Sequence, residues 1–201
     1  QFPLISVTNK YSQLSTLHVP RESFIGEVRN SFLRNIKSLT DVKIDGAAVI
    51  QEQAFQHCTG LKTISFEICE KIGNYAFMGC TSLETIYFKS CTVLGNYAFE
   101  DCTALSSIDL PILNVLGFHT FMNTALEEVY LDSVTTVSKY NLGSRQFSDC
   151  TKLTHISMKN ALVIPNFMFA GCYKLSSYDF PLVTEIGESA FRDCQSITNL
   201  N

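Results

Sequence analysis

The fold is decided by residues 83–102, which read Leu83-Glu-Thr-Ile86-Tyr-Phe88-Lys-Ser-Cys91-Thr-Val-Leu94-Gly95-Asn-Tyr-Ala98-Phe99-Glu-Asp-Cys102. The same order of apolar, glycine and cysteine positions returns before and after this stretch. Its phenylalanine recurs every 22 residues, with one longer step of 26, at Phe55, Phe77, Phe99, Phe121, Phe147, Phe169 and Phe191. In most copies a cysteine follows three residues later. Self-similarity at a fixed period of roughly 20–50 residues indicates stacked structural units, so the sequence predicts a solenoid.

The half-repeat Leu-x-x-Ile-x-Phe is short, rich in β-formers and apolar at spaced positions, which is typical of one strand in a parallel sheet. Nine such strands are predicted, beginning at Leu14, Leu39, Leu61, Leu83, Leu105, Leu126, Leu153, Leu175 and Ile197. At a spacing of about 4.8 Å they give a sheet roughly 40 Å long. One unit cannot bury its apolar face alone, so stacking is expected to place Leu on Leu, Ile on Ile and Phe on Phe.

The other half-repeat, Ile-Gly-x-x-Ala-Phe-x-x-Cys, predicts a corner followed by a turn. Its glycine is expected to adopt a positive φ, which glycine reaches without steric cost. This glycine is present at Gly26, Gly73, Gly95, Gly117 and Gly187. Gln51, Ser138 and Pro165 replace it elsewhere, so the corner cannot be identical in every unit. The Ala-Phe-x-x-Cys segment is too short for a full helix, and we expect about one turn of α- or 3₁₀-helix there.

The pattern resembles the BspA-like class of leucine-rich-repeat proteins. The match is carried by residues 105–111 and by residues 178–194, which read Tyr178-Asp-Phe180-Pro181-Leu-Val183-Thr-Glu-Ile186-Gly187-Glu-Ser-Ala190-Phe191-Arg-Asp-Cys194. The resemblance covers about residues 14–201 and implies an α/β fold. That fold is a curved, right-handed leucine-rich-repeat solenoid with a parallel concave sheet and short strands or one-turn helices on the convex side. We expect residues 1–201 to form one domain of about eight to nine repeats, cut from a longer array.

Composition excludes several classes of protein. Charged residues make up 17% and apolar residues 46%, so the chain has enough apolar surface to fold. A net charge of −4 argues against a nucleic-acid-binding protein, which normally carries a basic face. No apolar run approaches the roughly 18 residues of a membrane span. The chain opens at Gln1 with no targeting signal, and we expect a processed or excised chain.

Eight cysteines allow two interpretations, a disulfide framework or a column of buried free thiols. Cys69 and Cys91 occupy a position that is filled in other repeats by Leu113, Val134, Ala161 and Val183. A position that accepts these residues favours a small apolar group, which is how a free cysteine behaves. We therefore expect reduced, buried thiols, although the spacing between adjacent repeats does not by itself exclude a bridge.

The sequence contains no motif for enzyme chemistry. Phosphate-binding, dinucleotide-binding and nucleophile-elbow motifs do not occur. The histidines have no partner at metal-ligand spacing and stand at His18, His57, His119 and His155. We expect no catalytic residue, no metal site and no cofactor.

In the predicted strands the third and fifth residues alternate away from the core and face the concave side. The fifth position is occupied by His18, Lys43, Ser65, Tyr87, Asp109, Tyr130, Ser157, Asp179 and Asn201. Aromatic anchors and hydrogen-bonding groups come together in one patch, formed by Tyr87, Asp109, Glu128, Tyr130 and His155, which we predict as the binding site. The alternative is that these are only solvent-exposed strand residues.

Two irregularities interrupt the array. Five residues are inserted around Lys139–Gly143, and an insertion in a solenoid forms a surface loop, which is either functional or neutral. The chain stops at Asn201 inside a predicted strand without a polar capping segment. Solenoids need capped ends, so we expect either a longer array or end-to-end self-association through this terminus.

The resemblance also implies a function, because its class is known from the surfaces of anaerobic bacteria and from some protists, often as adhesins. We expect a non-enzymatic, adhesin-like module, on a cell surface or secreted, that binds a protein partner such as a host extracellular protein. Two alternatives stay open. One is a structural spacer or stalk in a larger surface protein, and the other is an intracellular scaffold, which reduced thiols would suit.

Overall fold

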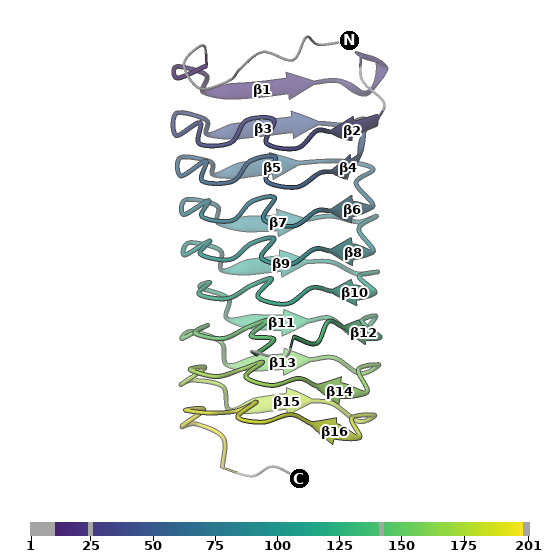
Figure 1. The fold of residues 1–201 in the computed structure, drawn as a ribbon, viewed down its shortest axis with the longest axis vertical. Coiled ribbons are helices and arrows are strands. Elements are labelled where there is room, and N and C mark those ends of the chain that lie inside the picture. Colours follow the sequence, from purple (N-terminus) through teal and green to yellow (C-terminus); the bar gives the residue numbers. More distant parts are fainter. Residues whose placement is uncertain (1–10, 24–25, 141–142, 199–201) are drawn as a thin grey trace.

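Short strands alternate between two columns in the computed structural model, which describes residues 11–23, 26–140 and 143–198 (Figure 1). The first column holds β1 (Thr16–Val19), β3 (Asp41–Ile44), β5 (Thr63–Ser65), β7 (Thr85–Tyr87), β9 (Ser107–Asp109), β11 (Glu128–Tyr130), β13 (His155–Ser157) and β15 (Ser177–Asp179). The second column holds β2 (Gly26–Val28), β4 (Ala47–Ile50), β6 (Lys71–Ile72), β8 (Val93–Leu94), β10 (Val115–Leu116), β12 (Thr136–Val137), β14 (Val163–Ile164) and β16 (Glu185–Ile186). The predicted parallel strands are therefore confirmed in the first column from β1 to β15. The ninth, from Ile197, runs into residues outside the described part of the chain.

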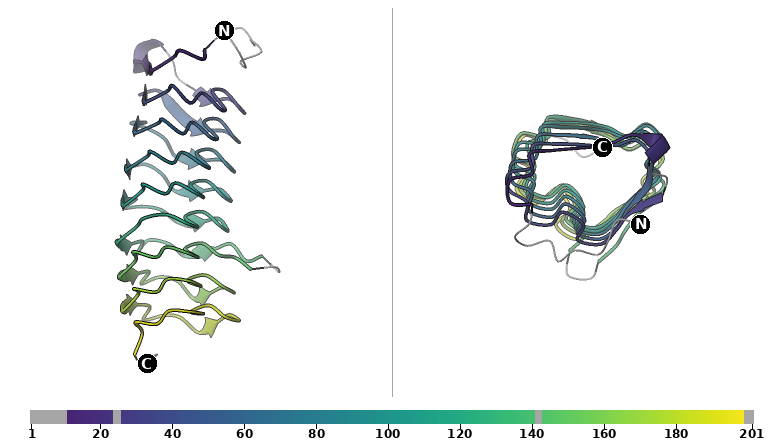
Figure 2. Two further views of the ribbon diagram at one scale, coloured as in Figure 1. Left: turned by 90° about the vertical axis from the view of Figure 1, so that its left-hand side faces the viewer. Right: turned by 90° about the horizontal axis from the view of Figure 1, so that it is seen from above.

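All strand pairs are parallel and join one coil to the next. Thr85 of β7 pairs with Ser107 of β9, and Val93 of β8 pairs with Val115 of β10. Hydrogen-bonded ladders break in the first column between β5 and β7 and between β9 and β11, and in the second between β12 and β14. The coils stack into a column that is nearly straight in both side views (Figures 1 and 2). The curvature and the right-handed sense remain predictions.

The core is a set of residue ladders that run along the stack. The repeated phenylalanines lie one above another, with ring centroids 5.3–5.7 Å apart from Phe55 to Phe191. All except Phe191 are fully buried, and so are the leucines that open each unit from Leu39 to Leu175. The predicted stacking of like on like is confirmed. It arises because each coil covers the apolar face of the coil before it.

The turn at Ala-Phe-x-x-Cys is not helical, which corrects the expectation of a one-turn helix. Its residues make isolated i→i+3 bonds, such as Cys80 N–H to the Phe77 carbonyl at 3.1 Å. The residues two before and two after Phe77, Tyr75 and Gly79, have φ of 57° and 72°. A left-handed residue ends a right-handed helix, so two of them in five residues prevent one. Within the described residues the one helical segment is the 3₁₀ turn Arg21–Ser23, and the fold is a parallel β-solenoid.

Four of the five corner glycines are required for close approach rather than for positive φ. Of the glycines predicted to have positive φ, Gly26 has it, at 153°, while Gly73, Gly95, Gly117 and Gly187 do not. A Cβ at Gly95 would lie 2.6 Å from the carbonyl carbon of Gly73 in the preceding coil. The prediction was wrong at these four positions because the crowding comes from a neighbouring coil, not from the local backbone.

The last described coil leaves part of the core uncovered. Ile186 is 57% exposed, whereas its counterpart one coil earlier, Ile164, is fully buried. Leu200 and Asn201 lie outside the described residues, so the predicted end-to-end self-association stays a prediction, as does the single domain over residues 1–201. None of the helical structure in the described ranges is long and apolar enough to cross a bilayer.

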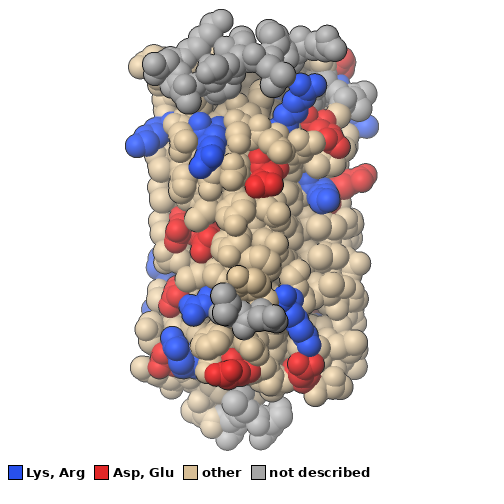
Figure 3. Space-filling view, viewed as in Figure 1, with Lys and Arg blue, Asp and Glu red and all other residues tan. Residues whose placement is uncertain are grey.

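Charged side chains are unevenly spread over the face turned toward the viewer in Figure 1. Lysine, arginine, aspartate and glutamate gather toward its two ends and along one side (Figure 3). The described residues over β8 and β10 form an uncharged tract on the other side (Figure 3).

Candidate protein-binding surface

The predicted patch lies on β7, β9, β11 and β13 of the first column. Side chains alternate there as the strand period requires: Ile86 is buried, while its neighbour Tyr87 is 48% exposed. Tyr130 is 59% exposed, and Asp109 and Glu128 are exposed as well. These four side chains therefore face solvent, as the outward positions of the repeat predict.

Three of the predicted residues form a connected cluster. The Tyr130 hydroxyl donates to Oε2 of Glu128 at 3.0 Å, and this hydrogen bond raises the pKa of Tyr130 above its ordinary value. The Tyr130 ring lies 5.3 Å from the half-buried His155 ring, which is the register partner of Glu128 on the next strand. His155 Nδ1 is 2.8 Å from the Ser177 hydroxyl. The Glu128–Tyr130–His155 cluster thus presents two ring side chains beside a carboxylate.

The other two predicted residues form a separate pair. Tyr87 and Asp109 are register partners on β7 and β9. Lys89, which the repeat pattern did not single out, places its Nζ 5.3 Å from the Tyr87 ring centroid. The ladder break between β9 and β11 separates this pair from the Glu128–Tyr130–His155 cluster. The structure therefore divides the predicted patch into two neighbouring groups.

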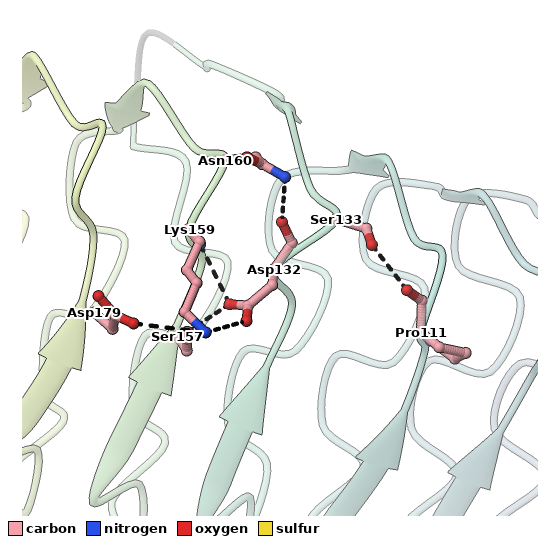
Figure 4. A network of polar contacts seen from close by, with 7 residues as sticks. All are labelled: Pro111, Asp132, Ser133, Ser157, Lys159, Asn160 and Asp179. Atoms are coloured by element: carbon pink, nitrogen blue, oxygen red, sulfur yellow. Dashed lines mark hydrogen bonds and ion pairs between the residues drawn. The ribbon is translucent and has the colours of Figure 1, made fainter.

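One residue predicted to face outward is buried. Ser157, at the end of β13, is 2% exposed, and its hydroxyl donates to Oδ1 of Asp132 in the preceding coil. Figure 4 shows why: Asp132 turns toward β13 and also accepts from Lys159 Nζ at 2.8 Å. Lys159 in turn lies 3.8 Å from Asp179. The alternating period of the strand does not reveal this contact, because Asp132 lies beyond the end of β11.

This network shifts the ionisation of both its charged members. Partial burial acts to raise the pKa of Asp132, but hydrogen bonds from Lys159 and Ser157 outweigh it and hold that pKa below its usual value. The hydrogen bond to Asp132 raises the pKa of Lys159. Both groups stay charged near neutral pH, and the network ties three successive coils together at the edge of the sheet. Its ion pairs are exposed, so solvent screens them strongly.

A shallow depression of about 590 Å³ lies at the start of the same strands. It is lined by Ser106, Ser107, Glu127, Glu128, Lys152, Thr154 and Lys174. Glu128 belongs both to this depression and to the Glu128–Tyr130–His155 cluster. The lining mixes both signs of charge with hydroxyl groups, which suits a polar segment of a protein more than an apolar small molecule.

The inserted segment is anchored to the coils around it. Lys139 Nζ lies 3.0 Å from a carboxylate oxygen of Glu185, two coils further on. The Tyr140 ring stacks on Phe118 of the previous coil with centroids 4.8 Å apart. Asn141 and Leu142 lie outside the described residues.

The cysteine side chains are mostly buried, and their thiols have low reactivity. All eight cysteines are free, and seven are buried, as predicted. Burial raises the pKa of Cys58 and of Cys91 to about 12, so very little reactive thiolate exists near neutral pH. Within the described ranges no three or more His, Cys, Asp or Glu residues come together in a way that could hold a metal ion.

These repeats also identify the chain by comparison. A family model described as the BspA type leucine rich repeat region matches in six copies, over residues 26–143 and 70–198. The chain belongs to the BspA-type leucine-rich repeat family. The two overlapping matches take in almost the whole of this BspA-type solenoid, both strand columns included.

Solved structures share the fold of this BspA-type chain. The leucine rich repeat protein of T. pallidum, TpLRR, superposes with a TM-score of 0.71 at 21% identity, covering 90% of this chain and 86% of that protein. The pneumococcal vaccine antigen PcpA gives 0.53 at 14% identity over 88% and 69%. A leucine rich cell surface protein from Faecalibacterium prausnitzii gives 0.51 at 18% identity over 92% and 74%. At these identities the likeness extends to the fold alone. A search of curated proteins found no match.

Proposed function

We propose that this chain is a non-enzymatic, adhesin-like protein-binding module that uses the outward face of its first strand column. The observation that carries the proposal is the Glu128–Tyr130–His155 cluster, where an exposed ring is fixed by a hydrogen bond and a ring contact. Fixed aromatic side chains lose little conformational entropy on binding, and tyrosine is enriched among residues that dominate interface energies. Tyr87 supplies a second anchor two strands away.

The family supports a protein as the partner, because repeats of this kind generally mediate protein interaction. A cell-surface or secreted location is favoured by the neighbour from Faecalibacterium prausnitzii, which is called a leucine rich cell surface protein. A host extracellular protein is therefore the first partner to seek. The alternatives are a spacer or stalk in a larger surface protein and an intracellular scaffold. Both predict that the Glu128–Tyr130–His155 cluster is dispensable.

Replacing Tyr87 and Tyr130 together with serine tests the proposal. Serine occupies the same outward position at Ser65, and neither tyrosine enters the core, so the double variant is expected to fold normally. Affinity for a partner captured from serum or extracellular matrix should fall by about 2 kcal/mol or more, roughly thirtyfold. Surface plasmon resonance measures the affinity, and thermal unfolding by circular dichroism confirms the fold.

Deleting Lys139–Gly143 is the control, because the exposed Lys139 and Tyr140 lie outside the first strand column. The deletion variant should bind like the unmodified chain. If the double tyrosine variant binds normally and the deletion variant does not, the binding site lies in the inserted loop instead. Failure to capture any partner with this chain, while longer pieces of the same surface protein do bind, supports the stalk instead.

A further inference from the structure

A second group of charged and aromatic side chains lies at the turn that follows the second strand column in each coil. Arg145 and Phe167 hold the same position on successive coils, two residues before the ladder phenylalanines Phe147 and Phe169. Both have a left-handed backbone, with φ of 48° and 59°. The Phe167 N–H donates to the Glu188 carbonyl of the next coil at 3.0 Å. The backbone therefore fixes the point from which these side chains extend.

Two arginines share the Phe167 ring. The guanidinium carbon of Arg145 lies over the ring, 5.2 Å from its centroid, and that of Arg192, one coil beyond Phe167, lies 5.5 Å from it. A guanidinium group is attracted to the face of an aromatic ring, and its N–H groups remain free to donate. Both carbons lie within 5.5 Å of one centroid, so they are at most twice that distance apart, about 11 Å.

The five-residue insertion ends against this group. Residues 138–140 lead outward from the column of coils (Figure 2), and Gly143, at the end of the insertion, is buried. A Cβ at Gly143 would lie 3.1 Å from the Phe167 ring and 3.3 Å from Nε of Arg145. The backbone of the insertion therefore packs on both side chains and limits how they can move.

Arg145 has no counter-ion within the chain. All 19 acidic residues lie in the described part of the chain, and none of them forms an ion pair with Arg145. Its guanidinium group also makes no hydrogen bond to a described residue. Arg145 is nevertheless half-buried, and a charge that leaves solvent is normally paired. The exposed Arg192 keeps one ion pair, in which its Nε lies 3.4 Å from a carboxylate oxygen of Asp193.

We propose that Arg145 and Arg192 bind two carboxylates of an extended acidic peptide segment, and that Phe167 holds the two guanidinium groups in position. Arginine offers paired N–H donors that match the two oxygens of a carboxylate. Acidic residues two positions apart on one face of an extended chain lie about 7 Å apart, and their side chains can reach both groups. Recognition of acidic motifs by arginine clusters is a recurring mode of peptide binding. This site goes beyond the proposed function, because it lies outside the first strand column and binds a different chemical group.

The surrounding charges favour two anionic groups over a long polyanion. Asp193 is paired with Arg192, and the exposed Glu188 lies on the coil that follows Phe167. Their carboxylates would repel a sulfated glycan or another polyanion that runs across the site. A peptide segment with two carboxylates can meet the two guanidinium groups without covering these acidic residues.

Titration of the full chain with a synthetic peptide, followed by NMR at low ionic strength, tests the proposal. The probe carries two glutamates separated by one serine, and the reference peptide carries glutamines instead. The acidic peptide should shift the Nε–H signals of Arg145 and Arg192 and bind at least about tenfold more tightly than the reference. Arg145→Gln should weaken binding at least about fivefold, and Gln53 shows that glutamine fits this position. Arg29→Gln removes the same charge near the other end of the stack and should leave binding unchanged.

Three further variants separate positioning from general attraction. Phe167→Ser should weaken binding, whereas Phe167→Tyr keeps the ring and should retain it; Ser189 and Tyr97 occupy this position in other coils. Asp193→Asn should strengthen binding severalfold, because it frees Arg192 and asparagine tolerates the left-handed backbone at this residue. Thermal unfolding shows that each variant is folded.

Equal binding of the two peptides overturns the proposal, and so do equal losses in Arg145→Gln and Arg29→Gln. A sulfated oligosaccharide that needs Arg145, on a chain that does not bind the acidic peptide, assigns the site to a glycan and also overturns it. The double serine variant of Tyr87 and Tyr130 should bind the acidic peptide normally. Failure of this site and failure of the proposed function are therefore separate results.

Discussion

At the scale of single residues, the cysteine of each unit does more than fill space. The Cys102 thiol donates to the Phe77 carbonyl of the preceding coil at 3.2 Å, and Cys80 makes the same bond to Phe55. Where threonine replaces this cysteine, the bond differs, because the Thr124 hydroxyl donates to the Phe121 carbonyl of its own coil at 2.9 Å. These thiols therefore link each coil to the one before it, whereas the Cys91 thiol donates only at 3.5 Å and to Val93, two residues further along its own coil. The two cysteine columns differ in what they contribute.

This difference predicts that substitution by valine lowers stability by unequal amounts at Cys102 and Cys91. Cys102→Val should lower the free energy of unfolding by about 1–3 kcal/mol, because it loses the thiol donor and adds a methyl beside the Phe77 carbonyl. Cys91→Val should cost less than about 1 kcal/mol, since Val134 fills the same position in another coil. Urea unfolding in the presence of reductant measures both. Equal costs would show that the thiol bond contributes nothing.

At the scale of the element, the stacking of the coils depends on how closely the corner of each coil approaches the corner of the preceding coil. Gly95 and Gly117 lie directly over the backbone of the preceding corner, where a Cβ would come within 2.6 Å and 2.5 Å of main-chain atoms. Hydrogen bonds hold this approach, for example from the Gly95 N–H to the Ile72 carbonyl at 2.8 Å. The corner is fixed by both contacts, so it cannot relax outward without losing ladder bonds.

Gly95→Ala should therefore destabilise the protein by at least about 2 kcal/mol, because backbone rather than a flexible side chain must move. Ser138→Ala is the matched control. It yields the same residue at the same position of another coil, where a side chain is already accommodated, and should change stability by no more than about 0.5 kcal/mol. Thermal unfolding followed by circular dichroism compares them. A near-neutral effect of Gly95→Ala would mean that the corners are packed more loosely than the distance of 2.6 Å indicates.

At the scale of the whole molecule, stability is shared along a one-dimensional stack. In the core each coil packs against its neighbours, and the phenylalanine ladder passes through every coil from Phe55 to Phe191. Phe99 has a stacked ring on both sides, at 5.3 and 5.6 Å. Phe191 stacks on Phe169 and is only half-buried. The same residue type should therefore contribute differently at the centre and at the end.

Phe99→Ala should lower the free energy of unfolding by about 3–5 kcal/mol, because it removes a fully buried ring and leaves a cavity. Phe191→Ala should cost roughly half of that, since solvent already reaches its ring. Chemical denaturation of both variants gives the comparison. An unchanged unfolding midpoint for Phe99→Ala would contradict the buried ladder.

The sequence by itself determined the repeat, the first strand column and the core ladders, because burial follows the period of the residues directly. It also placed Tyr87, Asp109, Glu128 and Tyr130 on the exposed face. Other features depend on contacts between coils, and these were decided only in the tertiary structure.

The turn, the glycines and the division of the site belong to this second group. The left-handed residues at the turn, the close approach at Gly95 and the burial of Ser157 under Asp132 all involve partners in other coils or unusual local backbone. The ladder break between β9 and β11 divides the predicted patch in the same way. A periodic pattern reports which side chains are inside. It does not report which atoms meet between residues 22–25 positions apart, because those contacts depend on how each coil packs on its neighbour.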